Sequence, residues 1–235
     1  MSDFQLLTML GLGFLLGLRH ALDADHVAAV SAVVARSSSI WRSGAVGICW
    51  GLGHTLILMI VGVVVVAFKV AIPEHLALWF EFGVGVMLVL LGGSLARTVY
   101  LEEWHWHSHE HGGSRHRHLH HHQTSAGHDH PHWLEGSLQP FFVGMAHGLA
   151  GSAALLLLVV SAVQTTVQAL TYIAMFGVGS ILGMMLVGVL ISMPLLYAEN
   201  LGPVARMSAR GLVSVVSIMV GLWTIISTGL LRELF

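Results

Sequence analysis

The stretch GLRHALDADHVAAV, residues 17–30, places ionisable side chains inside a long apolar segment. FLLGL begins at residue 14 and leads into it, and apolar residues continue to position 35. Charged side chains at membrane depth are costly and generally mark function. The stretch therefore predicts a functional site within a hydrophobic span. Its ionisable residues are Arg19, His20, Asp23, Asp25 and His26.

The composition indicates a helical membrane protein. Of the 235 residues, 55% are hydrophobic and 9% charged, whereas a soluble domain carries roughly 25% charged residues. The apolar runs are long and continuous, unlike the alternating strands of a membrane β-barrel. The net charge of −2 gives no reason to expect a nucleic-acid partner. The expected surroundings are a lipid bilayer.

About six transmembrane helices are predicted, so the fold class is an all-α polytopic membrane protein. The first span is longer than a bilayer requires, so we expect it to tilt, break or project. We divide the chain into a first three-helix unit at 1–101, a loop at 102–136 and a second three-helix unit at 137–235. The predicted spans are 4–35, 43–68, 76–100, 137–163, 168–197 and 209–231.

The two halves resemble each other. An offset of 127 places His20 on His147, and residues 50–56 (WGLGHTL) resemble residues 176–182 (FGVGSIL). Three spans per half is an odd number, so the second unit must be inverted relative to the first. Inverted repeats are typical of secondary transporters. The alternative is that glycines recur only because small residues favour helix packing in membranes.

The ionisable stretch has the chemistry of a transition-metal site. On an ideal helix, His20, Asp23 and His26 share one face, and Asp25 points away from it. Asp25 must therefore serve a neighbouring helix, or the helix must be distorted. Imidazole with carboxylate suits nickel, cobalt or zinc better than magnesium. The alternative is a structural ion-pair network in which Arg19 neutralises one of the two aspartates.

The same residues resemble the nickel/cobalt transporter family. His20, Asp25 and His26 match its His-x4-Asp-His signature, and residues 52–55 (LGHT) resemble its next motif. The resemblance implies that these three residues and His54 bind metal. With about six spans rather than the eight of many members, the chain resembles the shorter branch. That branch includes urease-accessory-type permeases and nickel/cobalt efflux proteins.

The second half adds one candidate ligand. As the repeat mate of His20, His147 is expected to complete the metal site, unless it is only a polar packing contact. Because the signature names Asp25, we expect that residue to bind the ion, with local unwinding of the helix. The residues expected to support the ligands without binding the ion are Asp23, Arg19 and Ser180.

The loop between the third and fourth spans is rich in histidine. Dense neutral imidazoles bind divalent transition metals loosely, and a segment this polar cannot form a core. We expect a disordered accessory metal reservoir or sensor, the alternative being a solvated linker with incidental affinity. Its histidines are His105, His107, His109, His111, His116, His118, His120, His121, His122, His128, His130 and His132.

The distribution of Lys and Arg predicts the orientation. With Arg19 set aside, seven basic residues fall in the first, third and fifth loops and two on the opposite side. The positive-inside rule then puts both termini outside and the histidine-rich loop in the cytoplasm. The seven are Arg36, Arg42, Arg97, Arg115, Arg117, Arg206 and Arg210, and the two are Lys69 and Arg232.

Together these features predict a secondary transporter of Ni²⁺ or Co²⁺ in the cytoplasmic membrane, with uptake favoured over efflux. We expect the metal as cargo, no organic cofactor and no enzymatic activity. A cytoplasmic metallochaperone or a second copy of the chain is left open as a partner. The alternatives are an intramembrane metalloenzyme and an efflux or sensor protein for divalent transition metals that include Zn²⁺.

Overall fold

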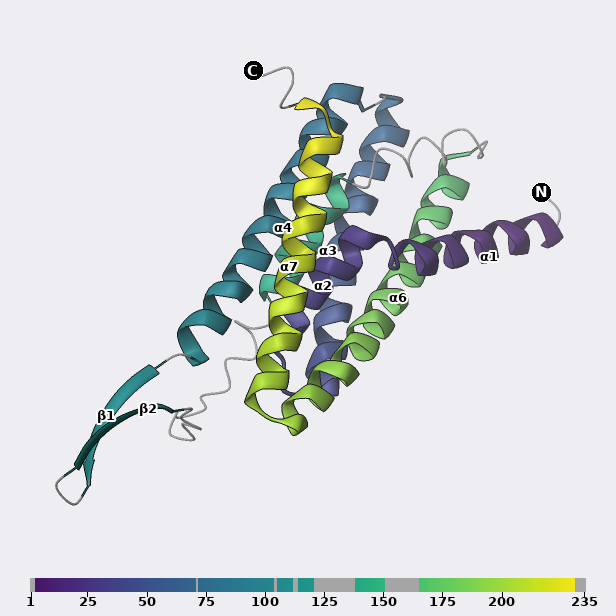
Figure 1. Ribbon diagram of the computed structural model, residues 1–235. Coiled ribbons are helices and arrows are strands. Elements are labelled where there is room, and N and C mark those ends of the chain that lie inside the picture. The colour runs from purple at the N-terminus through teal and green to yellow at the C-terminus, as the bar shows by residue number, and fades with distance from the viewer. Residues whose placement is uncertain are drawn as a thin grey trace.

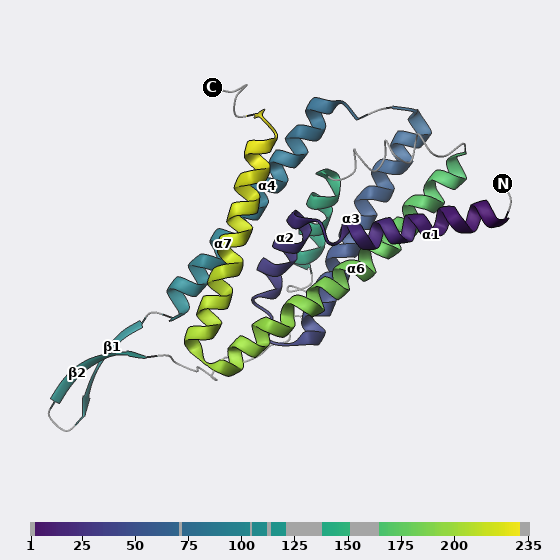
Figure 2. The ribbon, with the colours of Figure 1, turned by 45° about the vertical axis from the view of Figure 1, so that its right-hand side comes forward.

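The computed structural model describes residues 3–70, 72–103, 105–111, 114–120, 138–150 and 165–230. Its helices form one bundle, which α1 crosses at an angle to the long helices (Figures 1 and 2). Residues 138–150 are also helical. The other helices are α1 (Asp3–His20), α2 (Ala24–Val34), α3 (Ile40–Phe68), α4 (Glu74–Glu103), α6 (Thr166–Leu201) and α7 (Pro203–Ser227).

Among the described residues, four helices are long and apolar enough to cross a membrane: α3, α4, α6 and α7. The pair α1–α2 passes the same test when it is counted as one broken span, which gives up to five. The helix of the first predicted span is therefore interrupted between His20 and Ala24, and a break is one of the three outcomes expected from its length. The predicted span 137–163 is described only over the helical residues 138–150. The remainder of that span lies outside the described residues.

The long helices carry apolar side chains on their outer surfaces. On α7, for example, Leu212, Met219 and Trp223 are all largely exposed. Exposed apolar faces of this kind would be unfavourable in water but suit contact with lipid chains. Together with the spans, they describe a multi-pass membrane protein.

The main core surrounds α2, which lies within the bundle. Small residues such as Ala28 and Ala29 are buried here together with Trp50, Leu88 and Met184. Membrane helices associate through close packing, which small residues permit. The core thus holds α2 firmly against its neighbours and positions the start of that helix.

Glycines allow α1 and α6 to approach at backbone distance. A Cβ atom added at Gly17 would collide with the carbonyl group of Phe176, and one added at Gly179 would collide with the carbonyl oxygen of Phe14. Neither position can accept a side chain without moving a helix. This packing places the end of α1 against the middle of α6.

A second pair of helices approaches in the same way. A Cβ atom at Gly144 would collide with the carbonyl group of Trp50 in α3. Conversely, a Cβ atom at Gly53 would collide with the carbonyl oxygen of Phe141. The helix at residues 138–150 is therefore packed directly on α3.

Helices α4 and α7 form a third close pair. The Ser214 hydroxyl donates to the Gly92 carbonyl oxygen at 2.8 Å, and the Ser217 hydroxyl donates to the Leu88 carbonyl oxygen at 3.0 Å. Both serines are buried. Interhelical hydrogen bonds of this type stabilise packing where no water competes.

The histidine-rich segment contains a β-hairpin that composition did not lead us to expect. Strands β1 (His105–His111) and β2 (Ser114–His120) pair antiparallel, with His105 opposite His120 and His109 opposite His116. The hairpin extends away from the bundle at the end of α4 (Figure 1). The physical reason lies in the sequence, because histidine recurs at every second residue and this period fits a strand. Residues 112–113 and 121–137 lie outside the described residues.

Candidate metal site

The site forms where the first span breaks. Helix α1 ends at His20, α2 begins at Ala24, and the two helices meet at a bend of 58°. Asp23, with φ −62° and ψ 144°, occupies the N-cap position of α2, but its side chain does not cap the helix. Instead its carboxylate lies 2.8 Å from Nδ1 of His20. The break is a helix distortion, which is one of the two explanations that the position of Asp25 in the sequence allowed.

Four histidine rings gather at this break. His26, His54 and His147 are almost fully buried, and His20 is partly exposed. The His26 ring centroid lies 4.3 Å from that of His20, 5.1 Å from that of His54 and 4.1 Å from that of His147. The rings come from α1, α2, α3 and the helix at 138–150. The fold therefore unites histidines that are up to 127 positions apart in the sequence.

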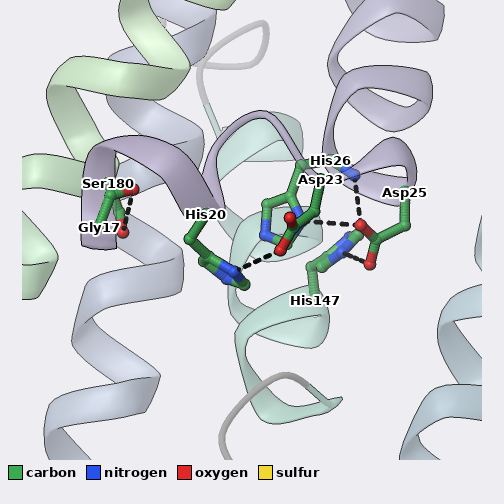
Figure 3. A network of polar contacts seen from close by, with 7 residues as sticks. All are labelled: Gly17, His20, Asp23, Asp25, His26, His147 and Ser180. Atoms are coloured by element: carbon green, nitrogen blue, oxygen red, sulfur yellow. Dashed lines mark hydrogen bonds and ion pairs between the residues drawn. The ribbon is translucent and has the colours of Figure 1, made fainter. Parts of the chain in front are cut away.

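Asp25 lies between two of these rings. Its Oδ1 accepts a hydrogen bond from the backbone amide of His26 at 2.9 Å and lies 3.0 Å from Nδ1 of the same residue. Its Oδ2 lies 2.9 Å from Nε2 of His147 (Figure 3). Asp25 thereby joins a residue of the first half of the chain to one of the second half.

Several buried ring nitrogens in the cluster have no hydrogen-bond partner. They are Nε2 of His26, Nδ1 of His147 and both ring nitrogens of His54. Buried polar atoms are nearly always paired, and an unpaired one is costly. Unpaired imidazole nitrogens on neighbouring rings are suited to bind a metal ion, which would satisfy them.

Two overlapping groups of side chains have ligand spacing. One ring nitrogen each from His20, His26 and His54 lie within 4.8 Å of one another. The same holds for one ligand atom each from Asp25, His26 and His147. His26 belongs to both groups. The five predicted ligands therefore lie together in the structure.

The electrostatics of the break favour a dication. Asp23 and Asp25 both contact the histidine cluster, and their charges together balance those of a divalent cation. Asp25 lies in the first turn of α2, where the helix dipole stabilises a carboxylate. His20 lies in the last turn of α1, where the dipole favours positive charge.

The three predicted supporting residues occupy different places. Asp23 contacts a candidate ligand directly. The buried Ser180 hydroxyl donates to the carbonyl oxygen of Gly17 at 3.3 Å and so joins α6 to α1 (Figure 3). Arg19 is exposed, and within the described part of the chain it forms no ion pair with Asp23 or Asp25. Histidine rings contact the two carboxylates instead.

Two aromatic residues of the site were missed in the sequence. Trp50 is completely buried, and its ring centroid lies 5.7 Å from that of His147. The Phe176 ring lies 5.3 Å from that of His20. A signal for Trp50 was present, because it precedes His54 by four residues and so shares its helix face. These rings shield the cluster with apolar surface.

Comparison with known proteins shows a clear relationship. The chain matches the NicO family, described as high-affinity nickel-transport protein, over residues 6–231. Urease accessory protein UreH of Bacillus sp. (strain TB-90) is 36% identical over 197 residues, which cover 83% of this chain and 80% of that protein.

A more distant relative is similar over a shorter region. The high-affinity nickel transport protein of Cupriavidus necator is 31% identical over 91 residues, which cover 38% of this chain and 24% of that protein. No solved structure matches the chain.

Proposed function

Since the chain belongs to the NicO family of high-affinity nickel-transport proteins, we propose that it carries Ni²⁺ or Co²⁺ across the cytoplasmic membrane as a secondary transporter. We favour uptake over efflux. The family consists of transporters and not of enzymes. The metal ion is therefore the transported substrate, and the protein lies in a lipid bilayer. A cytoplasmic metallochaperone and a second copy of the chain remain predicted partners.

The cluster of buried histidines carries this proposal. We assign binding of the ion to His20, Asp25, His26, His54 and His147, the residues that converge at the broken span. Their unpaired ring nitrogens match the borderline-soft cations Ni²⁺ and Co²⁺. The cluster is buried among helices, which is where transporters hold their cargo.

We further propose that the two halves are inverted repeats, as the sequence predicted. The close contacts support this, because they follow the sequence offsets. Gly17 packs on the backbone of Phe176, and their counterparts at offsets of 127 and 126, Gly144 and Trp50, pack on each other in the same way.

The reciprocal contacts obey the same rule. Gly179 packs on the backbone of Phe14, and the corresponding Gly53 packs on that of Phe141. Chance similarity of glycine-rich helices would not reproduce both contacts with one alignment. The metal cluster then lies between the repeats, and His147 is the ligand that the second repeat contributes.

We propose that both termini lie outside and that the histidine-rich loop is cytoplasmic. The α2–α3 connection, the end of α4 and the α6–α7 connection lie at one end of the bundle (Figure 2). The α3–α4 connection and the end of α7 lie at the other end. Most basic residues thus belong to the first end, as the positive-inside rule requires of the cytoplasmic side.

Single cysteines test this orientation. In a full-length Cys49→Ala background, His75→Cys should react with a membrane-impermeant maleimide on whole cells. Ser38→Cys should react only after the cells are permeabilised. Both positions are exposed, and they lie at opposite ends of α3. Ser38 comes just before α3, and His75 lies in the first turn of α4. The reverse labelling pattern would show that the orientation is wrong.

We propose that the histidine-rich loop is an accessory store of metal. Replacing its twelve histidines by asparagine should lower the number of nickel ions that the purified protein binds. Transport should continue, because the cluster at the broken span is unchanged. Equilibrium dialysis and vesicle uptake measure the two effects. Complete loss of transport by a correctly inserted variant would rule out a purely accessory role.

Purified protein in sealed vesicles tests the function itself. We expect ⁶³Ni²⁺ to enter protein-containing vesicles under an imposed proton or metal gradient, and not to enter empty ones. Failure of Ni²⁺ and Co²⁺ to move under any gradient would refute transport. The nickel content of cells with and without the protein then gives the direction, since accumulation indicates uptake and depletion indicates efflux.

A further inference from the structure

We propose that Asp23 and Asp25 are positioning residues that hold the histidine rings, and that the ion's protein ligands are imidazole nitrogens. This inference rests on the proposed function and refines it, because it removes Asp25 from the atoms that touch the metal. At the break, Asp23 fixes one histidine ring and Asp25 fixes two. Each ring then has its other nitrogen available for the ion.

The contacts of Asp25 carry the first step. Both carboxylate oxygens are engaged, Oδ1 by the amide and Nδ1 of His26 and Oδ2 by Nε2 of His147. A carboxylate can only accept hydrogen bonds, so these two ring nitrogens must carry the protons. They then have no lone pair available for an ion.

The second step follows from the opposite side of each ring. A neutral imidazole with one protonated nitrogen presents a lone pair at the other. That other atom is Nε2 in His26 and Nδ1 in His147, and both are buried without a partner. A ring whose one nitrogen faces a carboxylate while the other is free has the usual arrangement of a metal-binding histidine.

Asp23 repeats the arrangement on the other side of the break. Its Oδ2 lies 2.8 Å from Nδ1 of His20, which leaves Nε2 of that ring for the ion. His20 and His26 therefore use the same nitrogen toward a carboxylate. Together with His54, whose nitrogens are both unpaired, they form the group with ligand spacing that contains no carboxylate.

The competing group, Asp25 with His26 and His147, requires more rearrangement. An ion bound there through the ring nitrogens that face Asp25 would have to displace the two protons that face the carboxylate. In that case it would also leave Nε2 of His26 and both nitrogens of His54 unpaired. An ion bound by imidazoles instead satisfies these atoms and keeps every hydrogen bond of Asp25.

This arrangement has a consequence for selectivity. Mg²⁺ and Ca²⁺ prefer oxygen ligands, whereas imidazole suits Ni²⁺ and related metals. With the carboxylates hydrogen-bonded to the rings, their charge still balances the ion, but the atoms that contact the ion are nitrogens. Excess Mg²⁺ should therefore not compete with Ni²⁺ for the site.

Nickel X-ray absorption on the full-length chain tests the inference, in a background whose twelve loop histidines are asparagine. With one equivalent of Ni²⁺, Asp25→Asn should show the same number of imidazole ligands as the parent protein. Its dissociation constant should rise by about 10–100-fold, as is typical when a supporting partner of a metal-binding histidine is altered. The spectrum of His54→Ala should show one imidazole ligand fewer than that of the parent protein. This loss distinguishes the removal of a ligand from the removal of a residue that only positions one.

A carboxylate ligand in the parent spectrum that disappears in Asp25→Asn would overturn the inference and leave nickel transport intact. So would an Asp25→Asn protein with unchanged affinity. If Asp25→Asn does not fold, Asp23→Asn tests the same idea through His20. A parent protein that binds no nickel and moves none in vesicles would instead refute the proposed function, so the two failures are distinguishable.

Discussion

Replacing His54 by alanine should abolish nickel transport and leave the protein folded. The His54 ring is completely buried, both of its nitrogens are unpaired, and it lies close to the rings of two other candidate ligands. Its removal therefore takes away a ligand without breaking a hydrogen bond. We expect the affinity for Ni²⁺ to fall by at least about 100-fold, beyond what altering a supporting residue costs.

Vesicle uptake and thermal unfolding together measure this effect. Ni²⁺ should raise the melting temperature of the parent protein, because a ligand that binds only the folded state stabilises it. The shift and the uptake should both vanish in His54→Ala. His75→Ala is the matched control, since His75 is an exposed histidine at the start of α4 and its loss should change neither. Uptake by His54→Ala at the parent rate would remove His54 from the site.

Alanine at Gly17 and alanine at Gly144 should destabilise the protein to a similar degree. In both cases the new Cβ atom would overlap the backbone of a neighbouring helix, which cannot yield as a flexible side chain can. Overpacking of this kind costs about 1–3 kcal/mol and occasionally more. For a chain of this size, that lowers the melting temperature by roughly 2–12 °C.

Gly93→Ala is the control for both substitutions. Gly93 is also in a membrane helix, but apart from its chain neighbours and the nearby backbone of its own helix, no described atom lies within 4 Å of a Cβ atom placed there. Because alanine favours helix more than glycine does, this change should leave the melting temperature unchanged or slightly higher. Melting temperatures of detergent-solubilised protein measure all three. Tolerance of alanine at Gly17 but not at Gly144, or the reverse, would contradict the proposed equivalence of the two halves.

The sequence predicted the class of protein from local features. Long apolar runs and scarce charge indicated membrane helices, and the described helices confirm this. The excess length of the first span allowed a tilt, a break or a projection, and the structure shows a break in the helix. His20, Asp25 and His26 also indicated the nickel-transport family, which the comparisons confirm. These features can be predicted from sequence because the length of an apolar segment and the spacing within a short motif are properties of contiguous residues.

The secondary structure of the histidine-rich segment was not predicted from its composition. Its composition led us to expect no regular structure, yet residues 105–111 and 114–120 form a hairpin. Composition reports whether a segment can form a core, and not whether its neighbours in sequence can pair as strands. The alternation of histidine with other residues over 105–111 and 116–120 is the local feature that favours strands.

What the sequence by itself determined was the chemistry, namely imidazoles and carboxylates at membrane depth in a divalent-metal pattern. What only the tertiary structure decided was which atoms meet. A helical wheel could not place Asp25, because the break after His20 changes the direction of the chain. Nor could it show that Asp25 lies against His147, 122 residues away. Contacts between residues so far apart in the sequence depend on how closely the helices approach one another. Glycines at the helix contacts permit this approach, which is a property of the packed bundle.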